Sequence, residues 1–478
     1  MPTEYASPKH RVAQGLRELS ETLGPSEQEA LYELILRAEG LRDHRTLANL
    51  PQEALFSPEE RRLIAELDAQ PDPDVVLPRH PSLIVKPTRL CNLRCTYCNA
   101  WREGPDQNMS FEVLARMTHG VLRAPREPGP PGVLDASTTT FVWHGGEPML
   151  RDVRFFLQAL WLQHHWLPEG RFVANDMQTN ASRVTQGFLD LCRSFHISVS
   201  VSLDGPPDIH DARRLDAAGR PTFERVREGI RLLQAEGLGH AVLMVIDEDI
   251  IERGPQALLD YVRSLGVRNV GLLNLVPGND ENGIDGNGAW LHWARYVAFL
   301  RDLFQLWYPT YRHEFGIREL DEPLRIMAGE EPGLCIYQQD CFKIAFDVDP
   351  DGTVTGCDKY VGDPAFRYGS LLDAPVSEVL TNALVQVQRD RDRRDTDELR
   401  ACRWFHVCQG GCPHDRDVNR TMGLTGTDGC CGLGPLLDDI DEVVEHSTLA
   451  DSAIDAAFGR PAPHHSNAVQ AVPVALRR

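Results

Sequence analysis

Three cysteines lie within eight residues of one another, at positions 91–98, in the sequence CNLRCTYC. Their C-x3-C-x2-C spacing lets one short loop place three thiolates around one face of an iron–sulfur cubane, which leaves the fourth iron without a protein ligand. Ferredoxin-type electron carriers supply four cysteines to each cluster, so a loop with three keeps one iron free for chemistry. Zinc is the alternative, but structural zinc sites favour C-x2–4-C pairs with a second pair downstream. The spacing therefore favours an iron–sulfur centre.

Twelve cysteines occur in the chain, and eleven of them fall into two groups, residues 91–98 and 335–431. The second group holds eight cysteines, spaced C-x5-C-x15-C and then C-x5-C-x3-C before a final Cys-Cys pair. The N-terminus lacks the basic and apolar regions of a signal peptide. We therefore expect a reducing, cytoplasmic location in which these cysteines bind metal rather than form disulfides. Cys192 stands alone and is expected to be a core residue.

The composition excludes some classes of partner. The formal charge is −21, with 70 acidic against 49 basic residues. Such a surface repels phosphate backbones, so nucleic acid is not an expected partner. The sequence has no run of about 18 apolar residues, so no membrane span is expected. With 478 residues the chain has room for two or three domains.

Apolar strand-like runs alternate with amphipathic helical patterns between residues 81 and 310. The predicted strands are 82–85, 138–143, 171–174, 197–203, 241–246 and 270–275. Predicted helices include 155–164, 185–193, 223–235 and 254–265. This alternation predicts βαβ units and a parallel sheet, and parallel sheets bind ligands at the carboxyl ends of their strands.

Candidate ligand-binding residues follow these strands. The cysteine loop comes after the first strand, and the turn Gly145-Gly146-Glu147-Pro148 comes after the second. Two glycines let the backbone approach a ligand closely, and Glu147 can accept a charge-assisted hydrogen bond from an ammonium. The third and fourth strands lead to Gln178, Asn180, Ser202 and Arg214.

The two ends of the chain are expected to lie outside this α/β unit. Residues 1–80 are predicted to form a helical extension, with a helix start at Ser57-Pro58-Glu59-Glu60. The extension could hold a substrate peptide, or it could only cover the next domain. Residues 446–478, rich in Ala, Pro and His, are expected to be disordered.

The C-x3-C-x-aromatic-C loop resembles the signature of radical S-adenosylmethionine (SAM) enzymes. The resemblance implies a partial (β/α)6 TIM-like barrel over residues 81–310. It also implies a 4Fe-4S cluster on Cys91, Cys95 and Cys98 whose open iron binds SAM and whose electron cleaves SAM to a 5'-deoxyadenosyl radical. By the same resemblance Glu147 belongs to the turn that binds the methionine amino group, and Ser202 and Arg214 hold the carboxylate and ribose. The full set of implied SAM-binding residues is Tyr97, Gly145, Gly146, Glu147, Gln178, Asn180, Ser202 and Arg214.

Residues 311–445 resemble the SPASM domain, which holds two auxiliary 4Fe-4S clusters in peptide-modifying relatives. The resemblance assigns the first cluster to Cys335, Cys341, Cys357 and Cys412, and the second to Cys402, Cys408 and Cys430. The sequence departs from the pattern at Leu399, where relatives usually have a cysteine. Either Cys431 supplies the fourth thiolate, or one iron is open or bound by another residue such as Glu398.

The stretch from Ser-Leu-Asp-Gly-Pro at 202–206 onward narrows the resemblance to anaerobic sulfatase-maturating enzymes and their peptide-modifying relatives, over roughly residues 82–440. In those enzymes an aspartate at the place of Asp358 is the proposed base. Our leading hypothesis is a maturase that installs a cyclophane-like or thioether cross-link in a ribosomally made precursor peptide, with flavodoxin or ferredoxin as electron donor. The first alternative is formylglycine formation on a sulfatase Ser or Cys. A zinc-bound interaction scaffold is the alternative of another class.

Overall fold

The computed structural model describes residue 47 and residues 50–447, except 99, 105–106, 130–136, 240, 281–282, 285–289 and 423–431. A parallel sheet forms its centre. The strands β1 (Ser82–Thr88), β3 (Thr138–Gly145), β4 (Phe172–Thr179), β5 (Ser198–Ser202), β7 (Ala241–Ile246) and β8 (Asn269–Asn274) lie side by side in chain order. Each pairs in parallel with the next. The predicted α/β fold class is confirmed.

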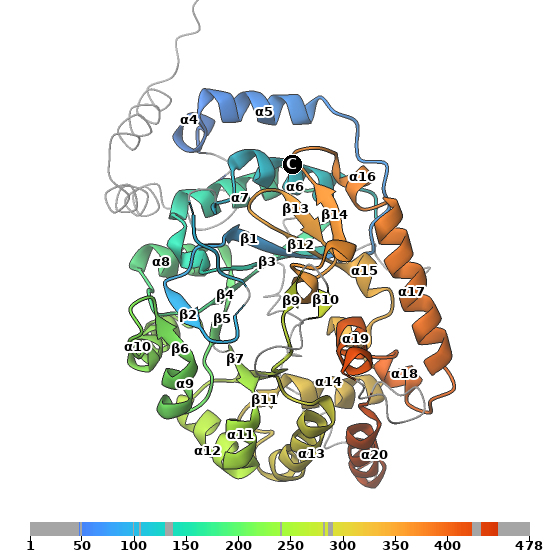
Figure 1. Ribbon diagram of the computed structural model, residues 1–478. Coiled ribbons are helices and arrows are strands. Elements are labelled where there is room, and N and C mark those ends of the chain that lie inside the picture. Colours follow the sequence, from blue (N-terminus) through green and yellow to red (C-terminus); the bar gives the residue numbers. More distant parts are fainter. Residues whose placement is uncertain are drawn as a thin grey trace, which may run out of the picture.

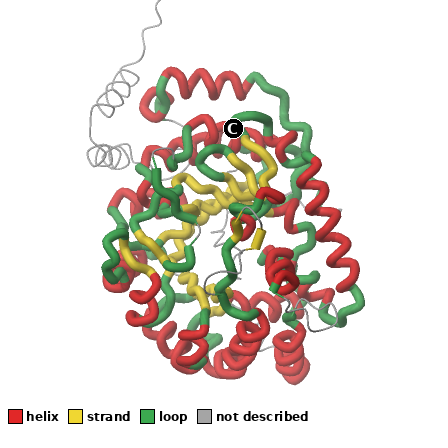
Figure 2. The backbone as a smooth tube through the Cα atoms, viewed as in Figure 1, coloured by secondary structure: helices red, strands yellow, loops and turns green. Residues whose placement is uncertain are grey.

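Helices connect these strands and lie around the outside of the curved sheet (Figures 1 and 2). They are α6 (Phe111–Arg123), α7 (Val153–Trp166), α8 (Gln186–Phe195), α9 (Pro207–Arg213), α10 (Phe223–Ala235), α11 (Glu248–Arg253), α12 (Pro255–Leu265) and α13 (Trp293–Thr310). Parallel strands need such crossovers because a short hairpin cannot join them. The side chains of Ser110, Asp152 and Thr185 cap α6, α7 and α8 by accepting backbone N–H groups of the first turn.

The sheet continues beyond the predicted barrel. On one edge β11 (Gly316–Ile317) pairs with β8, and on the other β12 (Ala345–Val348) pairs in parallel with β1. The strands β13 (Thr353–Thr355) and β14 (Arg367–Ser370) follow as antiparallel neighbours, so the turn at 349–352 joins β12 to β13. Residues on both sides of position 310 therefore share one sheet, which chain-local patterns could not indicate.

Two helices of the N-terminal extension are described, α4 (Gln52–Leu55) and α5 (Pro58–Asp68). Ser57 and Glu60 form a reciprocal capping box at the start of α5, as the sequence indicated. The carbonyl of Leu55 accepts hydrogen bonds from Arg154 Nη2 at 2.9 Å and Gln158 Nε2 at 2.8 Å on α7. This part of the extension packs on the barrel's outer helices, and residues 1–46 lie outside the described part of the chain.

The C-terminal part is mostly helical. Its remaining elements are α14 (Arg318–Met327), α15 (Cys341–Ile344), α16 (Val376–Val379), α17 (Ala383–Leu399), α18 (Phe405–Cys408), α19 (Pro413–Thr421) and α20 (Gly434–Ser447). Arg301 on α13 holds Asp439 on α20 through an ion pair at 2.7 Å. In the described ranges no helix is both long and apolar enough to cross a membrane. The tail predicted to be disordered from 446 was placed too early, since α20 includes 446 and 447; residues 448–478 lie outside the described part of the chain.

Candidate active site

The cysteine loop is fixed by a two-stranded sheet that the sequence did not predict. Its strand β2 (Leu93–Cys95) pairs antiparallel with β6 (Arg214–Asp216), so that Cys95 lies opposite Arg214. Cys91, Cys95 and Cys98 are all partly buried. Burial raises the pKa of Cys91 to about 12 and the pKa of Cys95 to about 11. Partly buried thiols of this kind gain when a metal cluster takes them as thiolates, so the donor set fits an iron–sulfur centre.

Tyr97 links the loop to the end of β5. Its hydroxyl donates to the Asp204 carboxylate and accepts a hydrogen bond from Arg214 Nη1 at 2.6 Å. Asp204 is fully buried, and Arg214 is 8% exposed. The Nε of Arg214 is buried and has no hydrogen-bond acceptor in the described part of the chain. This unused donor beside Cys95 is compatible with a carboxylate ligand at the place predicted for SAM.

The glycine turn packs directly beneath the cysteine loop. Gly146 N–H donates to Thr88 O at 2.9 Å, and Glu147 N–H donates to Leu90 O at 2.8 Å. A Cβ on Gly146 would lie 2.0 Å from the carbonyl oxygen of Leu90. Gly145 also has φ +104°, which favours glycine. The two glycines are therefore needed for the approach of the turn to the residue that precedes Cys91.

Gly146→Ala is expected to displace Leu90 and to lower stability by about 3 kcal/mol, the upper end for an added methyl group in a packed site. Because Leu90 precedes Cys91, the variant should also lose iron at the loop. Thermal unfolding and iron per chain would be measured against Gly219→Ala, which has nothing within 4 Å of the added atom and should cost only the backbone strain of alanine at φ +74°, about 1–2 kcal/mol, with no loss of iron. Equal effects of the two substitutions would contradict the steric argument.

Glu147 points into the protein and is 1% exposed. Its carboxylate accepts hydrogen bonds from Thr179 Oγ1 and Asn180 N, both at 2.7 Å, and from Met149 N at 3.0 Å. Burial raises the pKa of Glu147 above its ordinary value. In this arrangement Glu147 joins the turn to the end of β4, and its predicted contact with the methionine ammonium stays a prediction.

The remaining predicted SAM-binding residues meet at the same end of the sheet. Gln178 Nε2 donates to Ser202 Oγ at 2.7 Å, which joins the ends of β4 and β5. Asn180 Nδ2 donates to Asn92 Oδ1 at 2.9 Å and lies 3.8 Å from the Cys91 sulfur. Side chains from loops far apart in the sequence therefore surround the cysteine loop at the carboxyl ends of the strands.

Four of the downstream cysteines also come together. Burial raises the pKa of Cys341 well above its usual value, and the nearby thiols of Cys335, Cys357 and Cys412 raise it further. Lys359 Nζ lies 3.7 Å from the Cys412 sulfur and 2.6 Å from Asp415. In the described part of the chain no group of three or more His, Cys, Asp or Glu side chains is placed to hold a metal ion. The assignment of these four cysteines to the first auxiliary cluster therefore stays a prediction.

The second predicted auxiliary site is described only in part. Cys408 is buried in α18, Cys402 is partly buried before it, and Leu399 ends α17 with 7% exposure. Glu398 is exposed. Cys430 and Cys431 lie outside the described residues, so the ligands of this second site stay a prediction.

The sequence did not predict a buried ion network around Lys86. Lys86 lies on β1 with no exposed surface, and its Nζ is 2.7 Å from Asp347 Oδ1 and 2.9 Å from Asp358 Oδ1. Asp349 lies 3.6 Å from the same nitrogen and 2.6 Å from Arg89. A lysine between Val85 and Pro87 in an apolar strand is the one signal that could have indicated it.

The network determines the protonation state of Asp358, the predicted base. Burial alone would raise the pKa of Asp358, but Lys86 and then His144 outweigh it and hold the pKa well below the usual range. Burial raises the pKa of the neighbouring Asp347 to about 8, even though Lys86 opposes this. Asp358 is therefore held as a carboxylate at the junction of β1 and the downstream cysteines.

Residues 85–262 match the family model described as the radical SAM superfamily. This match covers part of β1, the cysteine loop and the strands through β7. Residues 85–262 therefore form a radical SAM domain, and the chain is an enzyme.

The chain is similar to anaerobic sulfatase-maturating enzymes. It is 28% identical over 353 residues to the cysteine-type enzyme of Clostridium perfringens (strain 13 / Type A), which covers 72% of this chain and 91% of the relative. It is 25% identical over 376 residues to the serine-type enzyme of Bacteroides thetaiotaomicron, covering 73% and 86%. A solved structure of histidine-tagged anSMEcpe with bound AdoMet has 25% identity and a TM-score of 0.63, covering 76% of this chain and 96% of the other. The recognised resemblance is confirmed.

Proposed function

We propose that the protein is a SAM-dependent maturase that modifies a side chain of a peptide or protein. The observation that carries the proposal is the meeting of the cysteine loop with Asn180, Arg214 and the Gln178–Ser202 pair at one end of the sheet. When bound, a 4Fe-4S cluster on Cys91, Cys95 and Cys98 would supply the electron that cleaves SAM to a 5'-deoxyadenosyl radical.

The chain's own residues would bind and orient SAM and the substrate. The buried Nε of Arg214 offers a donor to the SAM carboxylate, and Asn180 and Gln178 offer amides for its polar groups. Asp358 is our candidate base for the substrate side chain, and it is a weak one while its ion pair with Lys86 holds its pKa low. Closure of this end of the sheet around the substrate would exclude water, which protects a reactive intermediate from side reactions. An auxiliary cluster on Cys335, Cys341, Cys357 and Cys412 fits as the acceptor of the second electron.

Two products remain compatible with this chemistry. A cross-link in a ribosomally made peptide is our first candidate, because the departure of Leu399 from the cysteine pattern of SPASM relatives could leave an open auxiliary iron that binds substrate. Formylglycine formation is the second candidate, and the Asp358–Lys86 ion pair and the names of the similar enzymes favour it. Both candidates require reductive cleavage of SAM and a peptide or protein substrate.

The test uses anaerobically reconstituted protein with SAM, dithionite and two kinds of peptide. One is a sulfatase-derived peptide with its modifiable Ser or Cys, and the others are short peptides encoded beside the gene. We expect 5'-deoxyadenosine together with a modified peptide. A hydrazide probe then labels an aldehyde, whereas a cross-link is unlabelled and suppresses fragment ions between the joined residues. Zinc without sulfide, and no 5'-deoxyadenosine, would refute the proposal in favour of a scaffold.

Iron content tests the cluster assignment separately. We expect about twelve irons per chain if all three clusters form and about eight if the second auxiliary site is lost, at four per cubane. Cys341→Ala is expected to remove about four irons, because it deletes one of the four neighbouring thiols, while the cysteine loop keeps its own. Iron and sulfide analysis after desalting measures this, and an unchanged iron content would contradict the assignment of Cys341.

A further inference from the structure

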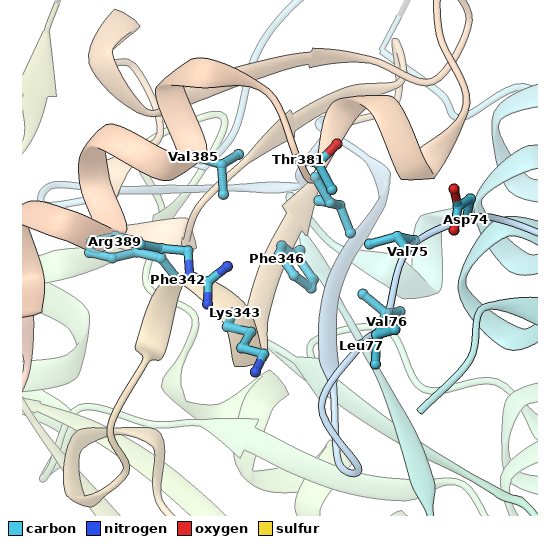
Figure 3. A pocket seen from close by; sticks show the side chains of 11 residues that line it. Asp74, Val75, Val76, Leu77, Phe342, Lys343, Phe346, Thr381, Val385 and Arg389 are labelled. Atoms are coloured by element: carbon cyan, nitrogen blue, oxygen red, sulfur yellow. The ribbon is translucent and has the colours of Figure 1, made fainter. Parts of the chain in front are cut away.

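A cavity of about 260 Å³ lies away from the cysteine loop, between residues 74–77 and the C-terminal helices (Figure 3). The chain after α5 runs down beside α16 and α17 there (Figure 1). Most of the lining is apolar, and it includes Val75, Leu77, Phe342, Phe346, Leu380 and Val385. Among the lining residues Val76 is 55% exposed. This surface can bury apolar side chains of a partner.

One cation in this cavity has no counter-charge among the residues that the structure describes. Arg389 of α17 lines the cavity, its Nε is buried, and its guanidinium has no hydrogen bond or ion pair to any described residue. Lys343, the other lining cation, is ion-paired with Glu127. Its Nη groups are not among the buried unpaired atoms, so an anion on a partner can reach them. The chain has a net charge of −21, and still no described carboxylate pairs with Arg389. This indicates that a partner bound in the cavity carries an acidic group.

The opposite wall offers an unpaired stretch of backbone. Leu77 exchanges backbone hydrogen bonds with its neighbours, accepting from Glu127 N at 2.9 Å and donating to Pro125 O at 2.9 Å. Val75 and Val76 have no backbone hydrogen bond to any described residue. Exposed backbone of this kind accepts an extended peptide as an added strand, with side-chain pockets giving specificity.

The cavity has an acidic residue at one end and a basic residue at the other, and its lining includes neighbours of Cys341 and Asp347. Asp74 and Arg389 lie at opposite ends of it (Figure 3), which sets the direction of a charged peptide. Phe342 directly follows Cys341 on α15. Phe346 lines the cavity, and the next residue of β12, Asp347, binds Lys86 on the other face of the strand, because successive side chains alternate.

We propose that this cavity binds an extended recognition segment of the peptide substrate, in which an acidic side chain pairs with Arg389 beside apolar side chains. The inference rests on the proposed maturase function, and it names how the substrate is held outside the reacting site. The bound segment lies along residues 75–76 and places its acidic side chain at the Arg389 end.

The test measures binding of two fluorescein-labelled peptides to the full chain by anisotropy, without turnover. One is a short peptide of Val and Leu with a single Glu, and the other has Lys in its place. We expect the Glu peptide to bind at least about tenfold more tightly than the Lys peptide. Arg389→Glu should reverse this preference. The matched control Arg394→Glu makes the same charge change on an exposed residue of α17 outside the cavity lining and should leave both affinities unchanged.

Three outcomes would overturn the proposal. The first is that the Glu peptide shows no saturable binding, and the second is that Arg389→Glu and Arg394→Glu have equal effects on binding. The third is that the protein self-associates in sedimentation and Arg389→Glu dissociates it, which would assign the cavity to a contact with a second copy of the chain. Formation of 5'-deoxyadenosine without peptide is followed in the same variants and should not change. Binding that survives in a protein unable to cleave SAM would refute the proposed function alone, while intact SAM cleavage without peptide binding would refute only the docking site.

Discussion

Cys95→Ala is expected to lower the formation of 5'-deoxyadenosine by more than about 1000-fold, because the radical chemistry is supplied by the cofactor that this thiol would hold. Cys95 ends β2 and pairs with Arg214 across the small sheet. The substitution changes no backbone hydrogen bond of that pair, so the loop keeps its place and only the ligand is lost. Product analysis with SAM and dithionite under argon, together with iron per chain, measures the effect.

Cys192→Ala is the matched control for this prediction. Cys192 lies in α8 with no exposed surface, and burial raises the pKa of its thiol to about 12, so it is a neutral core side chain. Its removal should cost about 1 kcal/mol of stability, since one buried sulfur is lost, and should leave SAM cleavage intact. Full activity of Cys95→Ala, or loss of activity in Cys192→Ala with normal folding, would contradict the assignment of the loop.

Lys86→Met is expected to destabilise the protein by about 3–5 kcal/mol, the cost of leaving buried charges without their partner. Lys86 and Asp347 both have no exposed surface, and the ammonium also holds Asp358 at 2.9 Å. Methionine has a similar length, so the loss comes from electrostatics rather than from a cavity. Because Lys86 lies on β1 and its partners follow in β12 and beyond, the pairing of β12 with β1 should loosen first. Denaturant unfolding and hydrogen exchange at residues 345–348 measure this.

A double substitution separates the ion pair from general packing. Asp358→Asn in the Lys86→Met background removes the carboxylate that stays charged beside the lost ammonium, so the combined loss of stability should be smaller than the sum of the single losses. The control is Lys343→Met, which makes the same change at a partly exposed lysine whose ammonium pairs with Glu127. That control should cost less than about 1 kcal/mol. A Lys86→Met protein as stable as the wild type would refute the network.

The sequence by itself determined the features that depend on local spacing. The three-cysteine loop, the glycine turn and the alternation of six strands with helices are written in consecutive residues, and the parallel order follows because each strand is joined to the next by a helix. The helix start at Ser57 is local for the same reason. The cysteine loop and the glycine turn indicated the radical SAM class before any tertiary contact was considered.

Only the tertiary structure decided which distant groups meet. It placed β12 beside β1, and with it the three carboxylates around Lys86, which are separated from that residue by more than 250 positions along the chain. It also turned Glu147 toward the end of β4, paired Arg214 with Tyr97, and placed Arg389 in an apolar cavity with no partner among the described residues. Periodicity records which face of an element is buried, but not which other element covers it, because that choice is made by contacts across the whole fold.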